Sequence, residues 1–524
     1  MTKNQIVFVA HQDHENLGVE YLTSMLIDRG FEIEILDFGL ENEEILNMVA
    51  KADRLLVGFS LLFQAYTPRL QDLTSYLRSN GISSHFTVGG HYSSLRFTDL
   101  LKLVPELDSV VRFEGEITIC ELAECLRNGK DWRGIEGIAY VGNNGPISNS
   151  LRPLIQDLDS LPFPTRVDPT RFQCMEINFS SILASRGCIR NCSFCSIRKF
   201  YQTPPGKLRR SRSPANVVAE MKDLYETHET RIFLFQDDDF LLPGKIGREW
   251  ISDFIHRLGR EEFSQDILWK ISCRSDEVDF DLFETMKALG LEIVGIGIES
   301  GNPTGLKILN KLLTVEDNIV AVKILKRLNL LFEFGFMLFD PSSTFDSVLA
   351  NIRFLETICS DGYSPVVYCK TLPYAETDIE KRLLAEGRLT GTLTQPDYDF
   401  LDPNLNNYYW FMYETFRDWM GIPTGLLARL RWHRFEVSVL EKFYPHAIGI
   451  PKYKASLTKI IESSNDLFFH VAKNALEHFR NPASDSEYHL KELATLKISR
   501  LEEITTRLSE GMALFQKWQK SSGD

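Results

Sequence analysis

The chain has 524 residues, more than one hydrophobic core normally supports, so two or three domains are expected. Its 44% hydrophobic and 25% charged residues are typical of a soluble globular protein. The net charge of -14 argues against a broad nucleic-acid-binding surface, and no apolar run approaches the length of a membrane span. The chain begins like a strand and not like a signal peptide, and most cysteines are scattered, so a reducing cytoplasm is expected.

Residues 1–145 alternate short β-branched runs with amphipathic segments, which predicts a doubly wound parallel, Rossmann-like α/β domain. Ligands of such sheets bind at the carboxyl ends of the strands. A phosphate-binding or response-regulator-like domain would fit this pattern equally well. Strands are predicted at 6–10, 33–36, 55–59, 85–88 and 110–113, and helices at 21–29, 68–79 and 117–127. The candidate binding residues in the loops are Asp13, His14, Asn16 and Gly18, then Ser60 and Leu61, then Gly89, Gly90 and His91, and finally Glu114, Gly115 and Glu116.

Residues 146–172 are predicted to form a linker, because Pro153, Pro162, Pro164 and Pro169 exclude a continuous helix. A second strand–helix alternation follows over 173–372. Its six units predict a partial (β/α)6 TIM-like barrel, whose active residues should lie on loops after the strands. The predicted strands are 176–184, 231–236, 268–273, 293–298, 331–338 and 366–370, and the helices are 214–226, 245–258, 280–289, 315–328 and 347–357.

A cysteine loop, residues 185–201, follows the first barrel strand. It contains Cys188, Cys192 and Cys195 in a C-x3-C-x2-C spacing. Three thiolates can converge on one soft metal centre, but they are one ligand too few for a closed tetrahedral site. A [4Fe–4S] cluster held by three cysteines leaves one iron open for a small chelating ligand. A zinc site with a distant fourth ligand and a packed cluster of inert thiols are the alternatives.

This loop, with Phe194 just before the third cysteine, resembles the cluster-binding signature of the radical S-adenosylmethionine (SAM) enzymes. The resemblance implies that Cys188, Cys192 and Cys195 bind the cluster. It also implies that SAM chelates the open iron and is cleaved to a 5′-deoxyadenosyl radical.

The loops of residues 1–145, upstream of the cysteine loop, resemble those of the cobalamin-binding domain often fused to radical SAM enzymes. Many such domains carry Asp-x-His-x-x-Gly, in which the histidine ligates cobalt. The matching residues here are Asp13, Glu15 and Gly18, and His14 is one position out of phase. The resemblance therefore implies bound cobalamin without histidine ligation, with Ser60, Gly89 and Gly90 near its nucleotide tail.

Several polar residues stand where predicted barrel strands end. Gln236, Asp237 and Asp238 follow the second strand, where consecutive carboxylates are either functional or part of a solvated turn. Arg274, after the third strand, could clamp a carboxylate. Glu299, in an apolar run before Ser300, needs a hydrogen-bond partner. In the resembled family Glu299 falls where the SAM ribose and amino group are held, and Lys311 lies in a matching segment.

Residues 373–524 are predicted to be mainly helical, with an aromatic-rich stretch at 397–420. Core packing is the expected role of these aromatics, and a substrate pocket is the alternative. The resemblance implies that this region covers the barrel and shapes substrate choice.

The predicted function is that of a cobalamin-dependent radical SAM enzyme that C-methylates an unactivated carbon of a natural-product or metabolic intermediate. The alternatives are a rearrangement, ring contraction or cyclisation without net methyl transfer, SAM-only chemistry without cobalamin, and a non-catalytic metal-binding protein. The expected partners are a small-molecule substrate and a reduced flavodoxin- or ferredoxin-type electron donor.

Overall fold

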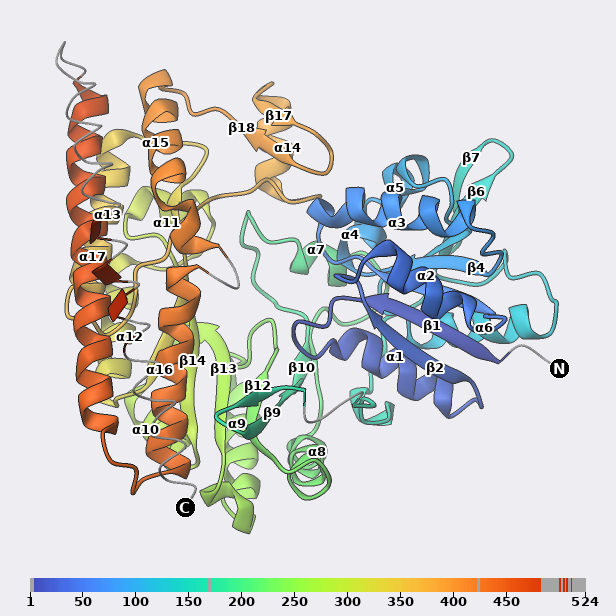
Figure 1. Cartoon of the computed structure of the whole chain (residues 1–524), viewed down its shortest axis with the longest axis horizontal. Helices are drawn as coiled ribbons and strands as arrows, with labels where there is room; N and C mark the ends of the chain where they lie inside the picture. Colours follow the sequence, from blue (N-terminus) through green and yellow to red (C-terminus); the bar gives the residue numbers. More distant parts are fainter. Residues whose placement is uncertain are drawn as a thin grey trace.

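The computed structural model describes residues 4–166, 171–421, 425–481 and a few positions between 499 and 510. Figure 1 shows an N-terminal sheet domain in blue, a curved central sheet in green and yellow, and long C-terminal helices in orange. Pro169 of the predicted linker and most of residues 482–524, the end of the region predicted to be helical, lie outside the described residues. None of the helices in the described ranges has the length and apolar content that a membrane crossing needs.

The N-terminal sheet has the strand order β2-β1-β3-β4-β5-β6-β7, and its first five strands are parallel. Alternate side chains of each strand point to opposite faces. Ile6 and Phe8 therefore pack under one pair of helices, α1 and α6, while Val7 and Val9 pack under α2 and α3. The strands are β1 (Gln5–Ala10), β2 (Glu32–Asp37), β3 (Leu56–Ser60), β4 (His85–Gly89) and β5 (Ser109–Val111), and the helices are α1 (Leu17–Ile27), α2 (Asn42–Ala50), α3 (Thr67–Ser79), α4 (His91–Leu95), α5 (Phe97–Leu103) and α6 (Glu116–Arg127).

The doubly wound architecture is confirmed, but several of its elements were not predicted. The short helices α2, α4 and α5 are absent from the elements predicted from the sequence. The sheet also continues through an antiparallel hairpin, β6 (Ile138–Gly142) and β7 (Gly145–Ser148), joined by a two-residue turn. The ordered sheet therefore extends past residue 145, where the first domain was predicted to end.

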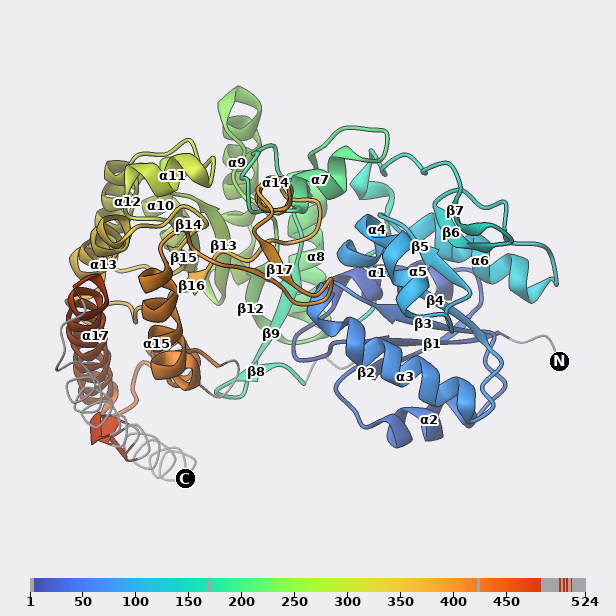
Figure 2. The same cartoon turned by 90° about the horizontal axis from the view of Figure 1, so that it is seen from above.

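The central sheet has the order β16-β15-β14-β13-β12-β9-β8. All six predicted parallel strands are present, in sequence order, and their crossover helices cover the convex face (Figure 2). Only the short antiparallel β8 (Gln173–Cys174) is additional. The strands are β9 (Ile177–Ile182), β12 (Thr230–Phe235), β13 (Leu268–Arg274), β14 (Leu291–Glu299), β15 (Leu331–Phe339) and β16 (Cys369–Lys370), and the helices are α8 (Pro214–Thr227), α9 (Gly244–Leu258), α10 (Phe280–Ala288), α11 (Pro303–Ile308), α12 (Val315–Arg327) and α13 (Phe345–Cys359).

The C-terminal region contains α14 (Asp378–Ala385), a small β17–β18 hairpin (Leu389–Gly391 and Pro396–Tyr398) and helices α15 (Pro403–Met420), α16 (Leu426–Phe443) and α17 (Ile450–Arg480). Most of its aromatic side chains are core residues, as predicted: Tyr408 and Phe416 are buried, whereas Trp410 is 48% exposed. Phe435 and Val439 of α16 pack against the first residues of the barrel strands, such as Leu268. Helix α16 therefore closes the amino-terminal end of the barrel.

A buried charge cluster joins the two sheets. The side chain of Arg166 is 2% exposed and lies 3.4 Å from Glu15, 3.2 Å from Glu20 and 2.9 Å from Glu220. Glu15 and Glu20 belong to the N-terminal domain and Glu220 to helix α8 of the barrel. Burial raises the pKa of Glu20 to about 8 although Arg166 lowers it, so the arginine offsets part of the free-energy cost of burying these carboxylates.

Replacing Arg166 with methionine should therefore cost roughly 3–5 kcal/mol, because three buried carboxylates lose their shared cation. Without Arg166, the pKa values of Glu15 and Glu20, which burial already raises, should rise further, so the folded state binds more protons than the unfolded state. The loss of unfolding free energy should therefore grow as pH rises from 5.5 to 8. Urea denaturation at both pH values measures it. Arg171→Met is the matched control: Arg171 pairs with Asp37 at 3.0 Å but is 42% exposed. Equal, pH-independent losses in both variants would contradict the role of Arg166.

Candidate active site

The three cysteines of the cysteine loop line one cavity of about 430 Å³ at the carboxyl end of the barrel strands. The loop follows β9 and runs from the short strand β10 (Ser185–Arg186) into helix α7 (Ile197–Gln202). The same cavity is lined by Phe194, Asp238, Arg274, Glu299 and Lys311. The structure thus brings together residues that the sequence predicted from four separate segments.

The backbone of the cysteine loop is shaped to support negatively charged sulfur. Gly187 has φ +86°, and a Cβ there would lie 2.1 Å from the carbonyl oxygen of Leu208, so no side chain fits. The backbone N–H of Arg190 donates to Sγ of Cys188 at 3.5 Å, and that of Ile197 donates to Cys195. Such N–H···S contacts are the outer-shell interactions that tune thiolate-held clusters.

Burial opposes ionisation of these thiols. It raises the pKa of Cys188 to about 11 and that of Cys195 to about 12, and it also raises the pKa of Cys192. In the described part of the chain, no three His, Cys, Asp or Glu side chains converge closely enough to hold a single metal ion. A soft all-sulfur donor set on one cavity wall, supplied with N–H donors, fits an iron–sulfur cluster.

The carboxylates after β12 fix the cysteine loop. Asp237 accepts hydrogen bonds from the backbone N–H of Ala184, at 3.0 Å, and from the hydroxyl of Ser185. Asp238 accepts from the N–H of Gly187 at 3.0 Å, and burial raises its pKa to about 6. Both side chains therefore hold the loop backbone; Asp237 is buried, whereas Asp238 is exposed on the cavity.

The cysteine loop is also held from the N-terminal domain. Arg186 pairs with Glu116 at 2.6 Å and with Glu114 at 3.3 Å, and Arg210 pairs with Glu114 at 2.8 Å. The ring of His91 lies 4.0 Å, centroid to centroid, from that of Phe200 in helix α7. The loops after β4 and β5, predicted to bind a cofactor, thus contact the cysteine loop itself, with Gly115 between the two glutamates.

In the same cavity, Glu299 lies 3.5 Å from Nζ of Lys311. Burial raises the pKa of Glu299, which has the left-handed φ of +62° at the end of β14. Arg274 pairs with Asp276 at 2.9 Å and donates to the carbonyl of Lys311 at 2.7 Å. Convergent charged groups of both signs suit a zwitterionic amino-acid ligand.

Two other predicted residues do not line this cavity. Ser300 lies behind the cavity, where its hydroxyl donates to Asn351 at 3.1 Å. Gln236 donates to the hydroxyl of Ser181 at 3.4 Å.

The loop after β1 is used mainly for structure. Asp13 and His14 form an exposed pair at 3.1 Å, and Asn16 caps helix α1, which contains Gly18, by accepting from the N–H of Val19. Glu15, at the position of the family's ligand histidine, is buried and accepts from the N–H of Ser181 in the barrel.

The carboxyl edge of the N-terminal sheet offers a different surface for a large ligand. Leu62, Phe63 and Tyr66, in the segment after β3, are exposed by 37%, 49% and 39%. Nearby, His11 and Gln12 after β1 each have a buried side-chain nitrogen without a hydrogen-bond partner. An apolar platform beside unsatisfied polar groups fits an amide-bearing macrocycle such as cobalamin.

The residues predicted at this edge are less exposed or shape the backbone. Ser60 is half-buried and Leu61 is buried. Gly90 has φ +113°, and a Cβ there would lie 2.5 Å from the carbonyl oxygen of Leu61, so only glycine fits this position. Gly89, the last residue of β4, accepts a hydrogen bond from the N–H of Leu61 at 2.8 Å. The sequence signal for the platform, three large apolar residues within five loop positions, was overlooked.

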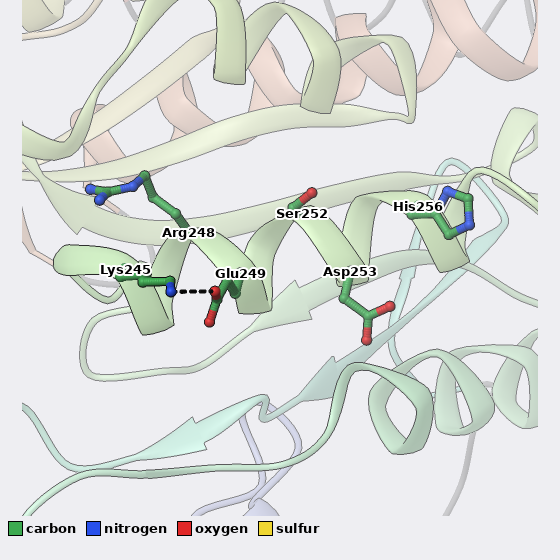
Figure 3. A pocket seen from close by; sticks show the side chains of 6 residues that line it. All are labelled: Lys245, Arg248, Glu249, Ser252, Asp253 and His256. Atoms are coloured by element: carbon green, nitrogen blue, oxygen red, sulfur yellow. Dashed lines mark ion pairs between the residues drawn. The ribbon is translucent and has the colours of Figure 1, made fainter.

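A second hollow is not a candidate active site. Figure 3 shows that its lining, which includes Lys245, Arg248 and His256, comes from one face of helix α9. Lys245 and Glu249 pair there at 3.7 Å, as neighbours on an exposed helix commonly do.

Comparison with known proteins agrees with this geometry. Residues 4–123 match the model of the B12 binding domain, and residues 182–355 match that of the radical SAM superfamily. The second match includes the cysteine loop and so favours an iron–sulfur cluster over a zinc site.

Curated relatives share less than a third of their residues with this chain. An uncharacterized methyltransferase of Pyrococcus horikoshii is 29% identical over 398 residues, which is 74% of this chain and 82% of that protein. The anaerobic magnesium-protoporphyrin IX monomethyl ester cyclase of Synechocystis is 29% identical over 329 residues, 60% of this chain and 62% of the cyclase. The hopanoid C-3 methylase of Methylococcus capsulatus is 28% identical over 327 residues, 60% of this chain and 59% of the methylase.

Solved structures share the fold. The cobalamin-dependent SAM radical enzyme OxsB has a TM-score of 0.69 at 17% identity, covering 98% of this chain and 81% of OxsB. The radical SAM methyltransferase TsrM of Kitasatospora setae has a TM-score of 0.61 at 20% identity, covering 74% of this chain and 78% of TsrM. The two family models together cover more than half of the chain, which belongs to the B12-binding radical SAM family, whose cofactors are a [4Fe–4S] cluster, S-adenosylmethionine and cobalamin.

Proposed function

We propose that this protein transfers a methyl group to an unactivated carbon of a small natural-product or metabolic intermediate. The carrying observation is that the carboxyl edges of the two sheets meet. Phe63, after β3, lies 6.1 Å, centroid to centroid, from Tyr374, after β16, and Gln64 accepts from the N–H of Ala375. A methyl carrier on the first edge would thus stand at the mouth of the cysteine cavity.

When bound, the cluster and SAM supply a hydrogen-abstracting 5′-deoxyadenosyl radical, and cobalamin supplies the methyl group. The protein's part is to hold and shield these groups. Cys188, Cys192 and Cys195 would hold the cluster. Glu299 and Lys311 would hold the polar ends of SAM, and Arg274 would help to fix Lys311.

The names of the relatives support methyl transfer, because a methyltransferase and a hopanoid methylase are among them. The cyclase among the relatives favours a second candidate, a cyclisation or rearrangement without net methyl transfer, in the same cavity. We also propose a reduced flavodoxin- or ferredoxin-type electron donor and a cytoplasmic location, since the cluster needs a low-potential electron.

The two candidates differ in the fate of the SAM methyl group. The reconstituted enzyme is incubated anaerobically with trideuteromethyl-SAM and a small-molecule extract from a host lacking this protein. Mass spectrometry should find a product that carries the intact label, together with S-adenosylhomocysteine. An unlabelled product accompanied by 5′-deoxyadenosine alone would support the second candidate and overturn methyl transfer.

The cysteine ligands can be tested without a substrate. Alanine at Cys188, Cys192 or Cys195 should abolish reductive formation of 5′-deoxyadenosine and the broad cluster absorbance, because two thiolates cannot retain a cluster that three normally hold. Chromatography and visible spectroscopy measure both. Cys125→Ala, in helix α6, is the control and should behave like the wild type. Undiminished turnover in any of the three variants would refute that cysteine as a ligand.

SAM binding tests the role of Glu299. Glu299→Gln should weaken SAM affinity roughly tenfold or more, since one charge-assisted hydrogen bond is removed. Calorimetric titration of the cluster-loaded protein measures the change. The exposed Glu316→Gln, in helix α12, is the matched control. Equal affinities for the two variants would contradict the assignment of Glu299.

A further inference from the structure

We infer that the closed end of the cavity binds an anionic group of the substrate, a carboxylate or a phosphate ester. The inference rests on the proposed function, because it treats the cavity that holds the cysteines as the place where the substrate binds. Its basis is a set of three charged side chains, Lys270, Glu333 and Arg431, which line this cavity but which neither the cluster nor SAM requires.

These residues lie deep in the barrel. Lys270 lies in β13 four residues before Arg274, which at about 3.3 Å per residue places it roughly 13 Å below the cavity mouth. Glu333 lies in β15, opposite Gly295 of the intervening strand β14. Gly295 has no side chain to separate the two, and Nζ of Lys270 lies 2.6 Å from Oε2 of Glu333. Arg431 comes from α16, the helix that closes the barrel below.

Arg431 is not satisfied within the described structure. Its Nη2 atom is buried and has no hydrogen-bond partner. An unmet buried donor costs about 1–3 kcal/mol, and more when the group is charged. Retaining this cost on a cavity wall is reasonable where a ligand supplies the missing acceptor.

The local charge balance indicates the sign of that ligand. Burial alone would raise the pKa of Glu333, but Lys270, with a smaller contribution from Arg431, brings it below its ordinary value. Glu333 is therefore ionised and forms its ion pair with Lys270. Two cations then face one carboxylate, so the positive charge of Arg431 is not neutralised by this pair. A guanidinium prefers carboxylate or phosphate oxygens, which match its planar fork.

The walls above this charged floor largely lack side chains. Gly295, Gly297 and Gly335 line them together with Ser272, whereas the neighbouring Ile296 and Phe334 belong to the buried core. A substrate whose acidic end pairs with Arg431 would thus extend its carbon skeleton toward the cysteine loop. The floor would select for the charge, and its distance from the loop would select which carbon reacts.

The test compares probes of equal size and different charge. The holoenzyme, loaded with cluster, cobalamin and SAM, is titrated with benzoate, phenyl phosphate and the neutral benzamide by ligand-observed NMR. At least one anion should bind about tenfold more tightly than benzamide. Arg431→Gln should lose this preference, whereas Arg248→Gln, the same change on the exposed face of α9 in Figure 3, should keep it.

A third variant should change the anion affinity in the opposite direction. Glu333→Gln removes the carboxylate that pairs with Lys270, so the anion should bind several-fold more tightly, which the loss of a purely structural ion pair would not cause. Anions that bind no more tightly than benzamide, a preference that survives in Arg431→Gln, or unchanged or weaker binding by Glu333→Gln would overturn the proposal. Because these are equilibrium measurements without turnover, they fail or succeed independently of the methyl-transfer experiment.

Discussion

Buried arginine–carboxylate pairs between the two sheets fix the geometry on which the site depends. Taking an ion out of water costs several kcal/mol, and the cost is offset only when its partner is in place. Arg166 meets carboxylates from both domains, and Arg186 and Arg210 meet Glu114 across the same boundary. A displaced domain would leave these charges buried and unpaired, so the pairs specify one relative position. Arg186 directly precedes Gly187 and Cys188, so that position also sets the cysteine loop.

The barrel was predictable because its determinants are local. Six apolar runs separated by five amphipathic helices could be recognised without knowledge of their partners, and all six strands formed where expected. The interdomain pairs were not predictable, because Glu15 and Arg166 are 151 positions apart and a charged residue does not reveal its partner. Glu114 and Glu116 illustrate the ambiguity: a carboxylate at a strand end can bind a ligand or an arginine, and here both contact Arg186.

A usable signal for the charged floor existed in the sequence. In β13, the polar residues Lys270, Ser272 and Arg274 alternate with Trp269, Ile271 and Cys273, the period expected when one face of a strand lines a polar interior. A prediction of strand alone for this segment does not use the alternation of its polar and apolar residues. Arg431 carried no comparable signal, because an arginine on an amphipathic helix normally faces solvent. Only the packing of Phe435 and Val439 under the barrel turns that helix inward at this point.

The replacement of histidine by Glu15 follows the same physical logic. Its carboxylate accepts from the N–H of Ser181 and faces Arg166, so the position that ligates cobalt in many relatives is here part of the domain boundary. Restoring a histidine would remove a charge from the Arg166 cluster and leave the Ser181 N–H without its acceptor. The binding edge must then depend on the platform of Leu62, Phe63 and Tyr66 and on the unsatisfied groups of His11 and Gln12. A cobalamin held at this edge would be bound by apolar contact and by hydrogen bonds to these groups, and under the proposed function it would supply a methyl group on the side that faces the barrel.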